Sequence, residues 1–94
     1  MDQKAALEKA VSIHGQSGLE RRLKQLGRSA RQQSISLWLE AGALPEGKDW
    51  ALWISRAIDF QVTPHELDKR AYPNPWDGLP IELARPLIEE KAAA

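Results

Sequence analysis

Residues 16–42, QSGLERRLKQLGRSARQQSISLWLEAG, predict two short amphipathic helices joined by a turn. Leu19, Leu23 and Leu26 recur at the spacing of one helical face, which marks the buried side of the first helix. Gly27 follows the last leucine, where a helix commonly ends in a left-handed residue. The turn is therefore expected to begin at this glycine.

Both helices carry start signals of the capping-box type. Ser17 is followed three positions later by Glu20, and Ser29 is followed by Gln32. In such a box each side chain bonds the backbone N–H of the other residue. The second helix then has a three-residue apolar stripe and a closing glycine: Ile35, Trp38, Leu39 and Gly42.

The face that this stripe leaves outside carries Arg31, Gln32, Gln33, Ser36 and Leu37. Gln and Arg side chains donate and accept hydrogen bonds of the kind that read base edges in a major groove. We interpret the segment as a DNA-binding helix-turn-helix. Gln32 has a second interpretation, as a capping side chain only.

Charge is unevenly distributed, although the net charge of the chain is zero. Up to residue 37 there are seven basic and three acidic residues, which gives +4; the remainder has six and ten, which gives −4. A chain with one anion-facing side would show this asymmetry. The alternative is that the helix faces are merely solvated.

Length and composition place the chain among small globular proteins. Its 94 residues, 43% of them hydrophobic and 28% charged, fit one modest core. We expect a helix-turn-helix domain over residues 1–72 and a Pro-rich segment with a short helical tail over 73–94. The polar start and the lack of a long apolar window predict a cytoplasmic protein that is not associated with a membrane.

No enzymatic motif is present in the sequence. There is no cysteine or glycine-rich phosphate loop, and the two histidines lack metal-ligand spacing. We expect a protein that is not an enzyme and needs no metal or cofactor. His14, at the edge of an apolar stripe, is expected to be a packed core or boundary residue.

Flanking helices complete an all-α bundle of five or six helices. The spacing predicts a helix over residues 2–14 that Gly15 ends, and another that Asp49 caps. Thr63, with Pro64 at the first helical position and Glu66 completing a capping box, is the clearest start signal in the chain. In the tail, Pro86 is expected to separate two short turns or to begin a further helix.

These segments resemble the small Cro/cI-type repressors of phages and prophages. RQQSISLWLEAG, ALPEG and VTPHEL most resemble the YdaS-type Cro-like proteins, and YPNPWDGLP resembles the ending of some members. The resemblance covers about residues 5–80. It implies an all-α, lambda-repressor-like DNA-binding domain of five helices that regulates transcription, binds operator half-sites as a dimer and is associated with the nucleoid of a bacterial host. Some members of this family are antitoxins.

The chain departs from that family in two places. About three extra residues lie between Leu23 and Gln32, which requires either a longer first helix or a looped connection; the leucine spacing favours the longer helix. After HEL the chain has Asp68-Lys69-Arg70, where the family usually has Arg-Pro.

The third helix, residues 31–41, is expected to lie in the major groove of double-stranded DNA with its N-terminal end towards the bases. Base-edge contacts are assigned to Gln32, Gln33 and Ser36, and a contact with a thymine methyl group to Leu37. Phosphate contacts are expected from a set of polar and basic residues: Gln16, Ser17, Arg21, Arg22, Lys24, Arg28 and Arg31.

The tail holds more apolar residues than a short extension buries alone, so it is expected either to dock on its own domain or to join a homodimer. The main rival function is a protein-interaction module, or an antitoxin-like protein that binds a partner and little DNA. Zero net charge, the exposed Leu37 and the insertion favour that rival.

Overall fold

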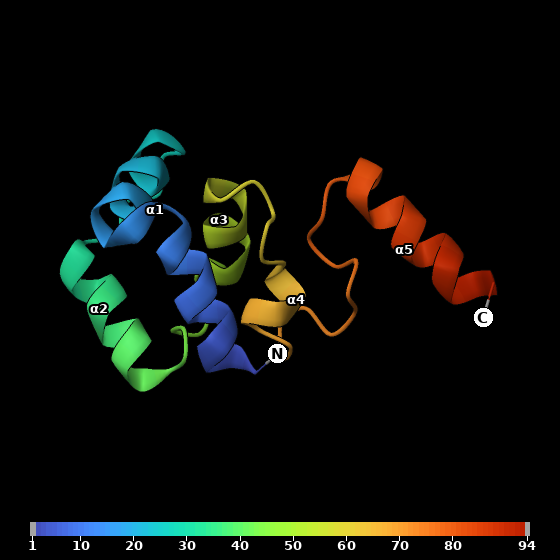
Figure 1. The fold of residues 1–94 in the computed structure, drawn as a ribbon, viewed down its shortest axis with the longest axis horizontal. Helices are drawn as coiled ribbons and strands as arrows, with labels where there is room; N and C mark the ends of the chain where they lie inside the picture. Colours follow the sequence, from blue (N-terminus) through green and yellow to red (C-terminus); the bar gives the residue numbers. More distant parts are fainter. Residues whose placement is uncertain (1, 94) are drawn as a thin grey trace.

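A computed structural model describes residues 2–93, which form five α-helices and no strand. Helices α1 to α4 pack together into one body, and α5 extends from it (Figure 1). The molecule measures 44 × 25 × 23 Å. The helices span α1 Gln3–Gln25, α2 Gln32–Ala41, α3 Trp50–Ala57, α4 Pro64–Leu67 and α5 Ile81–Ala93.

Helix α1 consists of two segments that meet at a sharp kink. Gly15, at the kink, has φ 75° and ψ 170°, a conformation open mainly to glycine. The prediction that Gly15 ends a first helix is confirmed, and a second helical segment begins directly after it. His14 is exposed, so the prediction of a packed position for it was wrong.

The core lies where both segments of α1 meet α2, α3 and α4. Helix α1 packs against each of these three helices, and α3 also packs against α4. Fully buried aliphatic side chains from every part of the body meet in this core: Leu7, Leu19, Leu23, Ile35, Ile54, Ile58, Val62 and Leu67. Ser55, the one buried polar residue of the described chain, donates its hydroxyl to the carbonyl of Val62 at 2.7 Å.

The first helix of the predicted pair extends to Gln25, and a five-residue connection follows its C-cap, Leu26. Gly27 has φ 85°, and the N–H of Arg28 donates to the carbonyl of Leu23 at 2.9 Å, as in a Schellman motif. Leu26 is 41% exposed, so the prediction that it continues the buried stripe was wrong. It lies at the helix end, where the chain already turns away from the core.

Both predicted capping boxes at the start of the α1–α2 pair were wrong. No hydrogen bond joins Ser17 to Glu20 in the described chain; the Glu20 carboxylate accepts the backbone N–H of Gln32 instead. Helix α2 begins at Gln32 with Arg31 as its N-cap, so Ser29 lies outside the helix. A carboxylate from the neighbouring helix has replaced the local cap.

The starts of α3 and α4 were predicted correctly in position. Asp49 is the N-cap of α3, but its φ of 54° is left-handed and its side chain makes no capping bond. Thr63 and Glu66 form the complete capping box, with Pro64 at the first turn of α4. Trp38 and Trp50 are buried with ring centroids 4.9 Å apart, so both tryptophans belong to the core, as the helical spacing indicated for Trp38.

The Pro-rich segment passes closely over α4 before α5 begins. Gly78 has φ 78°, and a Cβ atom there would lie 3.0 Å from Pro64 and 3.2 Å from the Tyr72 ring, so both the backbone conformation and the close approach favour glycine. Helix α5 runs unbroken through Pro86, which contradicts the expected interruption. Strong helix formers on both sides carry the helix past the single hydrogen bond that proline removes.

Candidate nucleic-acid interface

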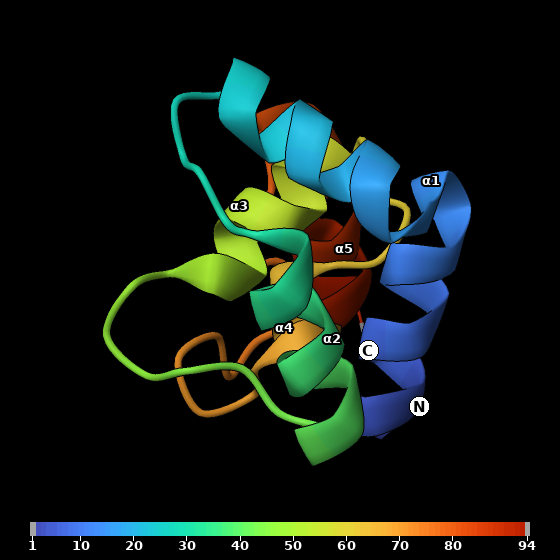
Figure 2. The same ribbon diagram turned by 90° about the vertical axis from the view of Figure 1, so that its left-hand side faces the viewer.

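The second segment of α1 and helix α2 form one surface of the body, with α2 in front of the viewer in Figure 2. Two hydrogen bonds join them. Glu20 accepts the N–H of Gln32 at the start of α2, and the Ser36 hydroxyl donates to Oε1 of Gln16 at 2.5 Å. These contacts, one helical turn apart on each helix, fix the position and rotation of α2 relative to α1.

Helix α2 is amphipathic, and its buried face is the one that the sequence predicted. Ile35 and Trp38 are buried, and Leu39 packs partly against the core. The four predicted base-contact residues are all exposed: Gln32, Gln33, Ser36 and Leu37. The exposed fraction of Leu37 is 59%. The side chains of Gln33 and Leu37 make no hydrogen bond within the described chain and have no packing role, so they are available to a ligand.

Three of the predicted phosphate-contact residues form an outward stripe on α1. Ser17, Arg21 and Lys24 are exposed and recur at the spacing of one helical face. Arg31, at the N-cap of α2, lines the same small hollow as Lys24. Within residues 2–93, Arg21, Lys24 and Arg31 pair with no carboxylate, and this leaves their charges directed at solvent.

Gln16 lies at the start of the same segment, directly after the kink at Gly15. Its side-chain oxygen is occupied by Ser36. Gln16 and Ser36, assigned to different roles from the sequence, are thus brought together as one hydrogen-bonded pair.

Arg22 and Arg28 have intramolecular partners instead. Arg22 donates from Nε to the carbonyl of Ala57 at 2.6 Å and lies 3.7 Å from the Asp59 carboxylate, so it links α1 to the end of α3. A cation at a helix C-terminus also interacts favourably with the helix dipole.

Arg28 lies against the indole rings of α3. Its guanidinium carbon is 5.3 Å from the centroid of Trp50 and 5.6 Å from that of Trp53. Its terminal nitrogen donates to the carbonyl of Lys48 at 2.6 Å. Arg56 approaches Trp53 at 5.0 Å, so a cation–π cluster holds the connection after α1 against α3.

Two acidic residues of this surface were not predicted from the sequence. Glu20 was assigned to a local capping box, and nothing in residue spacing shows that it reaches Gln32 across the turn. Glu40 is exposed on α2, seven residues after Gln33 and four after Ser36, and therefore shares their face. The helical spacing alone would have found Glu40.

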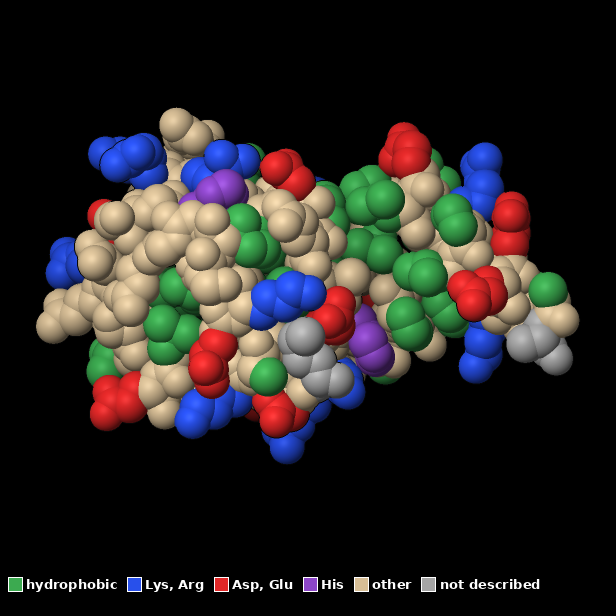
Figure 3. All heavy atoms as spheres, in the orientation of Figure 1, with side chains coloured by type: hydrophobic (Ala, Val, Ile, Leu, Met, Phe, Trp, Pro, Cys, Tyr) green, Lys and Arg blue, Asp and Glu red, His purple; other side chains and the backbone are tan. Residues whose placement is uncertain are grey.

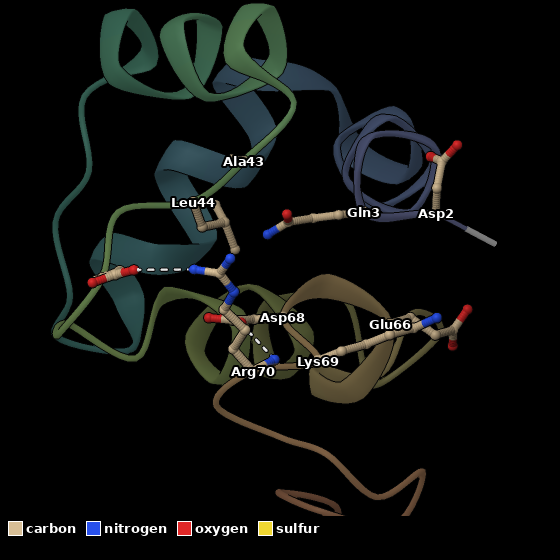
Figure 4. Close-up of a pocket in the computed structure, with 9 residues that line it drawn as sticks. Asp2, Gln3, Ala43, Leu44, Glu66, Asp68, Lys69 and Arg70 are labelled. Carbon is tan, nitrogen blue, oxygen red and sulfur yellow. Dashed lines mark hydrogen bonds and ion pairs between the residues drawn. The ribbon is translucent and has the colours of Figure 1, made fainter.

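A hollow on another side of the body is lined mostly by polar and charged side chains. It lies between the start of α1 and the segments that follow α2 and α4 (Figure 4). Gln3 donates to the carbonyl of Leu67 at 2.9 Å, and Arg70 points to Glu46 at 3.8 Å. Glu66 is used in the capping box, and Asp68 accepts from the backbone N–H of Arg70. Most of the polar groups that line the hollow therefore hold the surrounding segments together.

Charged side chains of both signs cover the body, and Lys/Arg gather at its upper left in the view of Figure 3. In the described part of the chain, no group of three or more His, Asp or Glu side chains is placed to hold a metal ion. No helix among residues 2–93 combines the length and apolar character needed to span a membrane.

Comparisons with protein-family models, with curated proteins and with solved structures found no match to this chain.

Proposed function

We propose that this protein is a sequence-specific DNA-binding regulator of transcription, a Cro-like repressor in its mode of action. Its α1–α2 pair acts as a helix-turn-helix of the lambda-repressor-like type, and α2 enters the major groove of operator DNA. Helix α2 is the third helix when the two segments of α1 are counted separately. Binding is proposed to involve a homodimer on two half-sites.

The observation that carries this proposal is the face of α2 that Gln33 and Ser36 share. Both side chains are exposed, and the helix that bears them is fixed by the contacts of Glu20 and Gln16. Gln is suited to bidentate bonding with adenine N6 and N7. The Ser36 hydroxyl donates its proton to Gln16, and its oxygen can still accept a hydrogen bond from a base edge. A polar face on a rigid, narrow element is what direct reading of a groove requires.

Phosphate binding is assigned to the exposed cations around that face: Arg21, Lys24 and Arg31. They pair with no carboxylate in the described chain, so their charges are free to replace the counterions of DNA. Arg22 and Arg28 contribute mainly to folding, because their guanidinium groups already bind other parts of the chain. This division refines the phosphate set expected from the sequence.

The test begins with selection of bound sequences from random double-stranded DNA by the full chain. The selected site is then titrated at several salt concentrations with the wild type and with the Arg21→Ala/Lys24→Ala/Arg31→Ala variant. The slope of log K against log salt should flatten by about 0.9 for each phosphate that the variant no longer neutralises. The control removes three positive charges elsewhere, at Lys9, Lys69 and Lys91, and should leave most of the slope unchanged.

A second candidate function is recognition of a protein, as in an antitoxin-like partner-binding module. Leu37 is 59% exposed, and Glu40 adds a negative charge to the same face of α2. Both features suit a protein surface better than a polyanion. If the selection enriches no sequence and the wild type shows no steep salt dependence, this second function replaces the first.

A further inference from the structure

Helix α5 is an amphipathic helix that its own chain covers on one side only. It packs against none of α1 to α4. Ala84 is buried and Leu87 is half-buried, on the side where Leu87 and Trp76 line one groove. The Pro-rich segment therefore covers a single strip of α5.

A second strip of α5 faces solvent and is largely apolar. Ile81, Arg85, Ile88 and Ala92 follow one another at the spacing of one helical face, and all four are exposed. Ile81 is 57% exposed and Ile88 is 41% exposed. Figure 3 shows hydrophobic side chains gathered over the Pro-rich segment and α5, in the right-hand part of the molecule.

A helix as short as α5 has little stability of its own, and exposure of its apolar side chains adds none. Isolated helices of fewer than ~12–15 residues are marginal in water, and a proline inside a helix costs about 3 kcal/mol more. Helix α5 has 13 residues and contains Pro86. Burial of the Ile81–Ile88 strip against another surface would add to the stability that the helix formers of α5 provide.

We propose that α5 is a self-association helix that pairs antiparallel with α5 of a second copy of this chain. The charges of the helix favour a second copy as the occupant. In an antiparallel pair centred near residue 87, Arg85 lies beside Glu89 of the partner subunit, and the two-fold symmetry forms this ion pair twice. Ile81 then lies near Ala92 of the partner subunit. The proposal is independent of DNA binding.

The geometry of the molecule permits this pairing without blocking the α1–α2 surface. Helices α2 and α5 lie at opposite ends of the long axis of the molecule (Figure 1). A dimer joined through α5 would leave both copies of α2 exposed and far apart. Self-association and ligand binding at α2 can therefore be measured separately.

The experiment is sedimentation equilibrium of the full chain without DNA, from about 1 to about 300 µM, a range that covers the weak dimers formed by small interfaces. The wild type should form a dimer. Arg85→Glu and Glu89→Arg should each weaken the dimer by at least about tenfold, because each places like charges together at both symmetric positions. Lys69→Glu, a charge reversal outside α5, should leave the dimer affinity unchanged.

The decisive step is to mix the Arg85→Glu and Glu89→Arg variants. In an antiparallel pair, every 85–89 contact between the two variants again joins opposite charges, so the mixture should recover the dimer. The mixture leaves like charges together within each helix, so recovery cannot come from restored helix stability. Far-UV circular dichroism of each variant shows whether α5 has formed.

A wild type that stays monomeric over the whole range would overturn the proposal and leave the strip to a different protein. A dimer that neither reversal weakens, or a mixture that stays monomeric, would overturn it as well, since the contact would then lie elsewhere or have another orientation.

Discussion

Glu20 of α1 holds the first residue of α2 by accepting the backbone N–H of Gln32, and this contact joins the two helices of the candidate interface. A carboxylate at a helix N-terminus satisfies an unpaired donor and interacts with the positive end of the helix dipole. The side chain therefore has a structural role within the surface to which we assign DNA binding.

Replacement of Glu20 should loosen α2. We expect Glu20→Ala to lower the free energy of unfolding by about 1 kcal/mol, the usual cost of removing an N-terminal cap. Urea denaturation followed by tryptophan fluorescence measures the change. Glu8→Ala, an exposed position on the first segment of α1, is the matched control and should have almost no effect. Equal effects of the two variants would contradict the capping role.

Arg28 should contribute to stability rather than to the salt dependence of binding. Arg28→Ala removes contacts with two indole rings and the bond to the Lys48 carbonyl, and should cost about 1–3 kcal/mol of unfolding free energy. Arg21→Ala, which removes an exposed arginine of the preceding segment of α1, should cost less than about 0.5 kcal/mol. The reverse order in urea denaturation would show that the cation–π cluster carries little energy.

The features that the sequence predicted correctly depend on neighbours within a few residues. Thr63, Pro64 and Glu66 specify the start of α4 by local chemistry alone, and Gly15 specifies the kink because few other residues adopt its φ. The buried face of α2 followed from helical periodicity in the same way. These are the properties that a local pattern can encode.

The errors occurred where a distant partner competes with a local one. Glu20 suited a box with Ser17 but bonds Gln32 instead. The contact of Arg28 with the rings of α3 was likewise not foreseen. Residue spacing does not show that two segments meet after a turn. The prediction from the sequence overestimated Pro86 as a helix breaker. A proline removes one backbone hydrogen bond, and the other hydrogen bonds of α5 keep the helix continuous.

Tyr72 should ionise at higher pH than an ordinary tyrosine. Burial raises its pKa above the usual 10.0, and the nearby Asp49 carboxylate, 3.5 Å from the hydroxyl, raises it further. A raised phenol pKa means that folding favours the neutral form. The stabilisation of the fold that comes from this raised pKa is fully present below pH 10 and is lost as pH rises through the folded-state pKa.

Tyr72 is the only tyrosine, so absorbance of the phenolate follows this group alone. The titration midpoint should lie above 10.0, and Asp49→Asn should lower it only in part, because burial is the larger cause. A midpoint that Asp49→Asn leaves unchanged would show that the carboxylate does not act on the phenol.

Gln33 should read a base if α2 enters the major groove. Gln33→Ala should weaken binding to the selected site by about 1–3 kcal/mol and relax the preference at one base-pair position. Competition binding against a set of single-base variants of that site measures both effects. Gln25→Ala, an exposed glutamine on α1, serves as the control. Uniform weakening on every site would make Gln33 a backbone contact instead.

Glu40 should oppose DNA binding, because its negative charge lies on the face of α2 that carries Gln33 and Ser36. Glu40→Gln keeps the shape of the side chain and removes the repulsion from phosphates, so affinity should rise by about 0.5–1 kcal/mol at low salt and by less at high salt. Glu8→Gln is the control for the change in net charge. A loss of affinity confined to sites with one particular base pair would instead identify Glu40 as an acceptor for cytosine N4. An unchanged affinity would place the third turn of α2 outside the groove, with contact limited to the Gln33 end of the helix.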